Sequence, residues 1–90
     1  MFNTLENLIK LARDRKACPV DGSYTNKLLT DKPLSKSKVL EEVNELIEAV
    51  EGNTNKIHEA ADVLYHLLMY LEANEIKIED VMEELEKRKK

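Results

Sequence analysis

The sequence predicts an all-α protein of four to five helices, and two observations support this. The 90 residues are 42% hydrophobic and 36% charged, with two glycines, two prolines and one phenylalanine. This composition fits neither a β-sandwich nor a collagen-like or disordered chain. Apolar residues also recur at helical spacing along most of the chain. Because a chain this short can build only one core, we expect a single domain over residues 1–90.

The first two helices follow from their start and stop signals. The first should run from about residue 3 or 4 to residue 16, and Pro19 lies just beyond its predicted end. Ser23 is placed to cap a short helix over residues 24–30, because its hydroxyl can accept a hydrogen bond from a free backbone N–H. We expect Pro33 to close this second helix.

Three further helices complete the predicted fold. A third should extend from about residue 35 to residue 51, with Gly52 in the left-handed conformation that ends many helices. A fourth should span residues 54 or 55 to 73, and a last amphipathic helix residues 78–88. Charged residues interrupt even the most apolar stretch, so we expect no membrane-spanning segment.

The predicted third helix carries glutamates beside its apolar face. That face should be centred on Val39, Val43, Leu46 and Val50. Helical geometry then places Glu42 at the edge of the buried face, and Glu45 one turn further along the same flank. Glu41 and Glu48 should point towards solvent. Like charges at these spacings repel each other, by about 0.2–0.5 kcal/mol per pair in a plain helix.

The predicted fourth helix is apolar nearly all round, which is typical of a helix at the centre of a bundle. Its one polar stripe holds His58, Glu59, Asp62 and His66. We expect His66 to be a hydrogen-bonded structural residue and His58 to lie at the surface. Buried carboxylates cost free energy unless a cation faces them, and the arginines stand near the chain ends. Since carboxylate oxygens favour Mg²⁺ or Mn²⁺ over Zn²⁺, we expect such a metal between the third and fourth helices.

The acidic residues resemble the E-E-x-x-E…E-x-x-D signature of the all-α nucleoside triphosphate pyrophosphatases, the MazG-like superfamily. In this chain the signature is Glu41-Glu42-x-x-Glu45 followed by Glu59-x-x-Asp62. Within that superfamily, residues 22–29 (G-S-Y-T-N-K-L-L) are similar to a stretch of the phosphoribosyl-ATP pyrophosphohydrolase family. Residues 59–66 (E-A-A-D-V-L-Y-H) and 78–85 (I-E-D-V-M-E-E-L) are similar to that family as well. The acidic signature alone indicates the superfamily, and the Ser-Tyr-Thr segment points to this family.

The resemblance implies a Mg²⁺-dependent enzyme, with Mn²⁺ as the other candidate ion. The implied reaction is hydrolysis of the nucleotide phosphoribosyl-ATP to phosphoribosyl-AMP and pyrophosphate, an ATP-related step of histidine biosynthesis. The implied metal ligands are Glu42, Glu45, Glu59 and Asp62. The implied catalytic carboxylates are Glu41, Glu42 and Glu45, with Glu41 either a further ligand or the group that orients the attacking water.

The resemblance and the charges together indicate where the substrate and partners bind. The expected substrate-binding residues are Ser23, Tyr24, Thr25, Lys27 and Lys38. A chain of 90 residues cannot surround a large nucleotide, so we expect a MazG-like bundle completed by a homodimer. Leu40 stands where many relatives have glycine, which we interpret as a difference in packing. With no cyclohydrolase domain attached, we expect a stand-alone form that makes at most transient contact with a separate phosphoribosyl-AMP cyclohydrolase.

Two other functions are compatible with the residues alone. One is a MazG-like pyrophosphohydrolase that acts on another nucleotide, such as dUTP. The other is a non-catalytic helical dimerisation module whose acidic stripe is merely solvated. The net charge of −4, from 14 basic and 18 acidic residues, disfavours binding to nucleic acid or to an anionic membrane. The single Cys18 and the lack of an apolar leader indicate the reducing cytoplasm.

Overall fold

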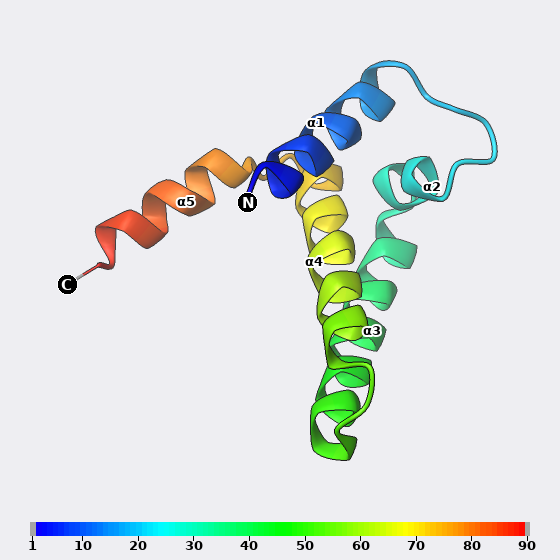
Figure 1. Ribbon diagram of the computed structural model, residues 1–90. Coiled ribbons are helices and arrows are strands. Elements are labelled where there is room, and N and C mark those ends of the chain that lie inside the picture. The colour runs from blue at the N-terminus through cyan, green and yellow to red at the C-terminus, as the bar shows by residue number, and fades with distance from the viewer. Residues whose placement is uncertain (1, 90) are drawn as a thin grey trace.

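The structure is a computed structural model that describes residues 2–89, and these residues form α-helices and connecting turns without any strand (Figure 1). In chain order the helices are α1 (Asn3–Ala17), α2 (Tyr24–Thr30), α3 (Lys32–Gly52), α4 (Lys56–Ala73) and α5 (Ile78–Lys87). The all-α prediction is therefore confirmed for the described chain. None of the described helices is long and apolar enough to cross a membrane.

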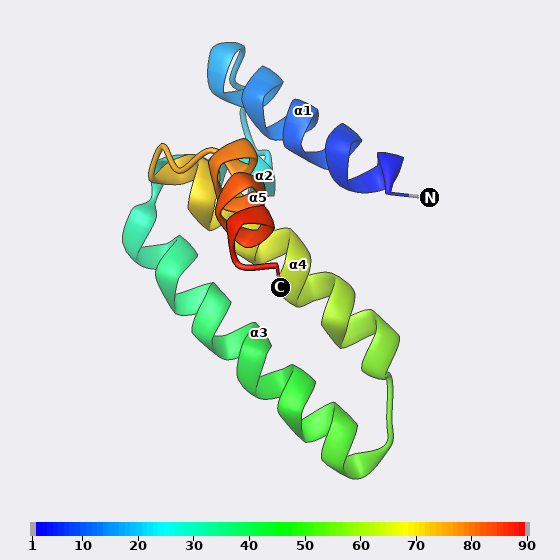
Figure 2. The same ribbon diagram turned by 90° about the vertical axis from the view of Figure 1, so that its left-hand side faces the viewer.

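The long helices α3 and α4 form a hairpin, and the other helices gather at one end of it. Figures 1 and 2 both show α3 and α4 side by side, joined by a short turn at the far end. Helix α4 packs against α1, α2 and α3, so the prediction that it occupies the centre is confirmed. Helix α5 extends away from the hairpin in Figure 1.

The core lies where α1, α2 and α4 meet. Its buried side chains are Ala12, Leu28, Leu29, Leu68 and Met69. The half-buried apolar residues packed around them are Leu5, Leu8, Ile9, Tyr65 and Ile78. A seven-residue helix such as α2 is not stable alone. Leu28 and Leu29 therefore fix its second half by packing.

The start of α3 differs from the sequence prediction. Ser23 caps α2 as expected, but Pro33 does not close that helix. Instead, Asp31 caps α3 by accepting a hydrogen bond from the backbone N–H of Leu34 at 3.1 Å. Pro33 falls in the first turn of α3, where its missing N–H has no helical partner to lose. Helix α3 therefore begins at Lys32, three residues earlier than predicted.

The end of α3 also differs from the prediction. Gly52 is the last helical residue, and Asn53 takes the left-handed conformation with φ 54°. Asparagine is one of the few non-glycine residues that adopt this conformation readily. Asn55, at φ 36°, has the same handedness just before α4. These two asparagines therefore turn the chain from α3 into α4.

The apolar face of α3 is less buried than the sequence predicts. Of its predicted centre, Val43 is 37% and Val50 56% exposed, while Val39 and Leu46 are half-buried. The buried positions of α3 are Ser35, Glu42 and Ala49. The helix thus turns the edge that carries Glu42 towards α4. An uncovered apolar face remains, which we call the open face, and it comprises Leu40, Val43, Ile47 and Val50.

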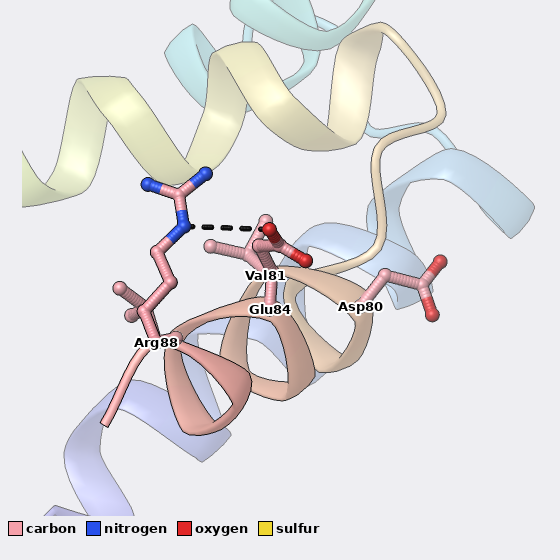
Figure 3. A pocket seen from close by; sticks show the side chains of 5 residues that line it. Asp80, Val81, Glu84 and Arg88 are labelled. Carbon is pink, nitrogen blue, oxygen red and sulfur yellow. Dashed lines mark hydrogen bonds and ion pairs between the residues drawn. The ribbon is translucent and has the colours of Figure 1, made fainter. Parts of the chain in front are cut away.

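Helix α5 is tied to the rest of the molecule by a polar clamp. The guanidinium of Arg13 donates to both carboxylate oxygens of Glu79, at 2.7 and 2.8 Å, and to the buried Glu72 on α4 at 3.3 Å. No residue of α5 is buried among those described. Figure 3 shows an open hollow along this helix, where Arg88 pairs with Glu84 at 3.3 Å.

Candidate metal centre

Two clusters of possible metal ligands lie on the facing helices α3 and α4. On α3, ligand atoms of Glu41, Glu42 and Glu45 lie within 4.8 Å of one another. On α4, ligand atoms of His58, Glu59 and Asp62 lie within the same distance of one another. Both clusters have the spacing i, i+1, i+4, which gathers side chains on one side of a helix.

The two clusters influence each other electrostatically across the hairpin. Burial raises the pKa of Glu42, and the neighbouring Glu45 carboxyl and the charge of Asp62 raise it further. Burial also raises the pKa of Glu59, and Glu45 adds to the effect from the opposite helix. Glu45 therefore links the α3 cluster to the α4 cluster. The four predicted metal ligands thus influence one another electrostatically, and we call Glu42, Glu45, Glu59 and Asp62 the acidic site.

Two oxygens of this site fit a bound cation. Glu42 is 8% exposed, and both its Oε2 and the Oε2 of Glu59 are buried without a hydrogen-bond partner. A buried oxygen that lacks a partner costs free energy, because it has lost its water and gained nothing. A divalent cation would bind the ionised carboxylates and oppose the upward shifts in pKa. The donor set is all oxygen around the buried pair, which suits Mg²⁺ or Mn²⁺.

The two histidines differ in their surroundings. The ring of His66 is buried, and its Nδ1 lies 2.7 Å from the backbone oxygen of Asp62. A carbonyl oxygen only accepts, so Nδ1 carries the proton and Nε2 accepts from the hydroxyl of Tyr24 at 2.8 Å. Both nitrogens are thus engaged, and the prediction of a structural His66 is confirmed. His58 is exposed as expected, although its Nε2 lies 3.4 Å from Asp62 Oδ2.

The carboxylates that were predicted to face solvent do so. Glu41 is exposed at the rim of the site and pairs with Lys38 at 3.2 Å. This contact raises the pKa of Lys38, which therefore stays charged. Glu48 is exposed and lies outside both clusters of possible ligands.

The Ser-Tyr-Thr segment forms the capped start of α2. Ser23 Oγ accepts from the backbone N–H of Asn26 at 3.3 Å and from Arg15 at 2.7 Å. Asn26, which the sequence did not single out, holds the preceding loop by accepting from the N–H of Val20 at 2.8 Å. Lys27 is exposed. An open hollow of ≈ 440 Å³ adjoins the segment and is lined by residues 19–24, Asn26, Lys27 and Thr30.

The start of α2 lies close to the acidic site. Burial raises the pKa of Tyr24, and the charges of Lys38, Glu42 and Glu41 also act on it. Residues expected to bind substrate therefore lie beside residues expected to bind metal. Nothing in the sequence spacing indicates this, because Tyr24 and His66 are 42 residues apart.

Sequence comparison relates this chain to a known family. The family model described as phosphoribosyl-ATP pyrophosphohydrolase matches residues 5–89. The chain belongs to the phosphoribosyl-ATP pyrophosphohydrolase family. The match covers every described helix except the first two residues of α1. The resemblance noted in the sequence is thereby confirmed.

Individual members of the phosphoribosyl-ATP pyrophosphohydrolase family are similar over nearly the whole chain. A phosphoribosyl-ATP pyrophosphatase of Methylobacterium nodulans is 46% identical over 88 residues, which are 94% of this chain and 82% of the relative. One of Sulfurisphaera tokodaii is 43% identical over 91 residues, covering 98% and 97%. The histidine biosynthesis bifunctional protein of Arabidopsis thaliana is 40% identical over 90 residues, 94% of this chain but 32% of that protein. No solved structure matches this chain.

Proposed function

We propose that this chain hydrolyses phosphoribosyl-ATP to phosphoribosyl-AMP and pyrophosphate, the second step of histidine biosynthesis. Two relatives at 43% and 46% identity are phosphoribosyl-ATP pyrophosphatases by name, which supports the substrate. The observation that carries the proposal is the pair of facing acidic clusters with two buried, unpartnered carboxylate oxygens. A merely solvated acidic face would not bury such oxygens.

In this proposal Glu42, Glu45, Glu59 and Asp62 hold Mg²⁺, or Mn²⁺ in its place. The bound ion supplies positive charge for the phosphoanhydride oxygens and lowers the pKa of a water molecule. The four carboxylates concentrate negative charge at one place on a rigid helical hairpin. Glu42 and Glu59 contribute the buried oxygens, to which no donor within residues 2–89 is bonded.

Glu41 is the proposed proton acceptor for the attacking water. It lies at the exposed rim of the site, within 4.8 Å of ligand atoms of Glu42 and Glu45. A carboxylate at this distance can accept a proton as general base once water is positioned. Lys38, which pairs with Glu41, holds that carboxylate in place.

The substrate's remaining phosphates are assigned to the basic residues beside the acidic site. Lys38 and Lys27 are the proposed phosphate-binding cations. Lys27 lines the adjoining hollow together with Ser23, which accepts a hydrogen bond from Arg15. A chain with a net charge of −4 would repel a polyanion elsewhere on its surface. Lys27 on α2 and Lys38 on α3 would therefore guide the substrate towards the metal.

The proposal extends to partners and setting. We propose a homodimer, because the open face of α3 and exposed Leu64 and Leu67 on α4 are apolar and uncovered. Residues 1–90 would act as one domain in the cytoplasm. The bifunctional relatives support a transient contact with a separate phosphoribosyl-AMP cyclohydrolase.

A nucleotide panel tests the proposed function. Pyrophosphate release is measured from phosphoribosyl-ATP, ATP and dUTP, each with Mg²⁺ and again with excess EDTA. We expect Mg²⁺-dependent turnover of phosphoribosyl-ATP alone. Turnover of ATP or dUTP instead would support the acidic site as catalytic but contradict the proposed substrate. No turnover of any nucleotide would contradict the proposal that this chain is an enzyme of this kind.

A further inference from the structure

Every hydroxyl of the Ser-Tyr-Thr segment is already engaged within the protein. Ser23 accepts from Arg15 and from the backbone of Asn26. Tyr24 donates to Nε2 of His66 at 2.8 Å. The Thr25 hydroxyl lies 2.6 Å from the hydroxyl of Tyr65, and Thr25 is only 9% exposed. A hydroxyl in this state is poorly placed to bind a nucleotide directly.

Two of these hydrogen bonds join the first turn of α2 to adjacent residues of α4. The rings reinforce the bonds: Tyr24 stacks on Tyr65 with centroids 6.4 Å apart. His66 makes edge-to-face contacts with both tyrosines, and its ring centroid lies 5.1 Å from that of Tyr65 and 5.8 Å from that of Tyr24. Offset stacking and edge contacts at these distances are favourable arrangements for aromatic rings. We call this group of Tyr24, Thr25, Tyr65 and His66 the aromatic lock.

The aromatic lock lies between the two parts of the proposed site. On α4, Tyr65 and His66 follow Asp62 by one helical turn, and His66 bonds to the Asp62 backbone. On α2, Tyr24 precedes Lys27 by one turn. The last turn of α2 is held by Leu28 and Leu29 in the core. Its first turn is held by the lock together with the bonds of Ser23 to Arg15 and of Asn26 to the backbone of Val20.

We infer that Tyr24 and Thr25 are positioning residues, whose bonds to His66 and Tyr65 hold the first turn of α2, and with it the proposed phosphate-binding Lys27 one turn on, against the metal-binding carboxylates of α4. This inference rests on the proposed function and replaces direct substrate contact for these two residues. A seven-residue helix has little stability of its own. Without the lock, its first turn spends part of the time away from the carboxylates, and the apparent substrate affinity falls by that fraction.

Hydroxyl deletions on both sides of one bond test the inference. Thr25→Val and Tyr65→Phe remove the two partners separately, and Thr25→Ser restores a hydroxyl at the first position. We expect each deletion to raise KM for phosphoribosyl-ATP about 3- to 10-fold, the scale of one hydrogen bond, with kcat changed less than about 2-fold. Thr25→Ser should stay near the original KM. The double variant should be no worse than either single one, because both remove the same bond.

Tyr70→Phe is the matched control on α4. Within residues 2–89 the hydroxyl of Tyr70 makes no hydrogen bond, and the bonds from Asn74 go to the backbone oxygen of Tyr70. Tyr70→Phe therefore deletes a tyrosine hydroxyl outside the lock. Its KM should be unchanged. If Thr25→Val raises KM while Tyr65→Phe does not, Thr25 binds substrate directly and the inference is wrong. It is equally wrong if both deletions leave KM unchanged.

Amide hydrogen exchange separates this inference from the proposed function. Residues 24–30 should exchange faster in Thr25→Val and Tyr65→Phe than in Tyr70→Phe. If the original protein fails to hydrolyse phosphoribosyl-ATP, the proposed function is lost, while exchange still tests whether the lock holds α2. Unchanged exchange overturns the lock itself. Faster exchange with unchanged KM in an active enzyme shows a structural role only and overturns the positioning role.

Discussion

At the scale of single residues, the site concentrates carboxylates that repel one another. Glu42 and the half-buried Glu59 keep raised pKa values because both lose contact with solvent and both are influenced by Glu45. A fold gains no stability from such an arrangement by itself. The carboxylates become favourable only when a cation binds to them, so metal binding should be visible in stability as well as in activity.

Metal binding is testable through thermal unfolding. At a Mg²⁺ concentration about 100-fold above its dissociation constant, a bound ion adds about 2.7 kcal/mol to the free energy of unfolding. We therefore expect Tm to rise by about 10 °C or more on adding Mg²⁺ and to fall back with EDTA. Glu45→Gln should lose most of this rise. Glu48→Gln, outside the clusters, is the control and should keep it; an unchanged Tm in the original protein argues against a metal site.

At the scale of elements, the sequence predicts the helices well but not how they face one another. Periodicity and capping residues locate α2, α4 and α5 closely, because these signals are local. The start of α3 was missed because Pro33 can end one helix or open the next. The sequence does not predict which side of α3 faces α4, because an apolar stripe does not specify which neighbour covers it. Family resemblance named the acidic residues, whereas only the folded hairpin shows which of their oxygens are buried.

The contact between Arg13 on α1 and Glu79 on α5, which forms the polar clamp, should depend on pH. The hydrogen bonds from Arg13 lower the pKa of Glu79 to about 2 from its ordinary 4.5. A lowered pKa means that the stabilising contact is complete above pH 4.5 and is lost as pH falls towards 2. In an NMR titration the Glu79 carboxyl carbon should therefore have its midpoint near 2. In Arg13→Gln the midpoint should return towards 4.5. Equal midpoints in the two proteins would show that Arg13 does not lower the pKa of Glu79.

At the scale of the whole molecule, one chain leaves apolar surface uncovered on both helices of the hairpin. On α4, Ile57 is 87% and Leu64 50% exposed, and α3 has its open face. The small core lies at one end of the hairpin, and among the described residues α3 and α4 pack only against each other at the other end (Figure 1). A second copy covering this surface would complete the bundle around the acidic site.

The dimer is tested by placing a charge on the open face. Sedimentation at micromolar concentration should show a dimer, and Ile47→Asp should shift it to monomer because a carboxylate would be buried in an apolar interface. Ser37→Asp adds the same charge at an exposed α3 position outside the open face and should stay dimeric. A stable, active monomer of the original protein would contradict the proposed assembly.

The most direct test of the central claim is turnover of phosphoribosyl-ATP by ligand variants. Steady-state pyrophosphate release with Mg²⁺ is compared for the original protein, Glu45→Gln, Asp62→Asn and the Glu48→Gln control. Loss of a metal ligand should lower turnover at least about 100-fold in the first two variants, with the helical fold retained by circular dichroism. The Glu48→Gln control should keep normal turnover. Near-normal rates in both Glu45→Gln and Asp62→Asn would remove these carboxylates from the reaction and contradict the account.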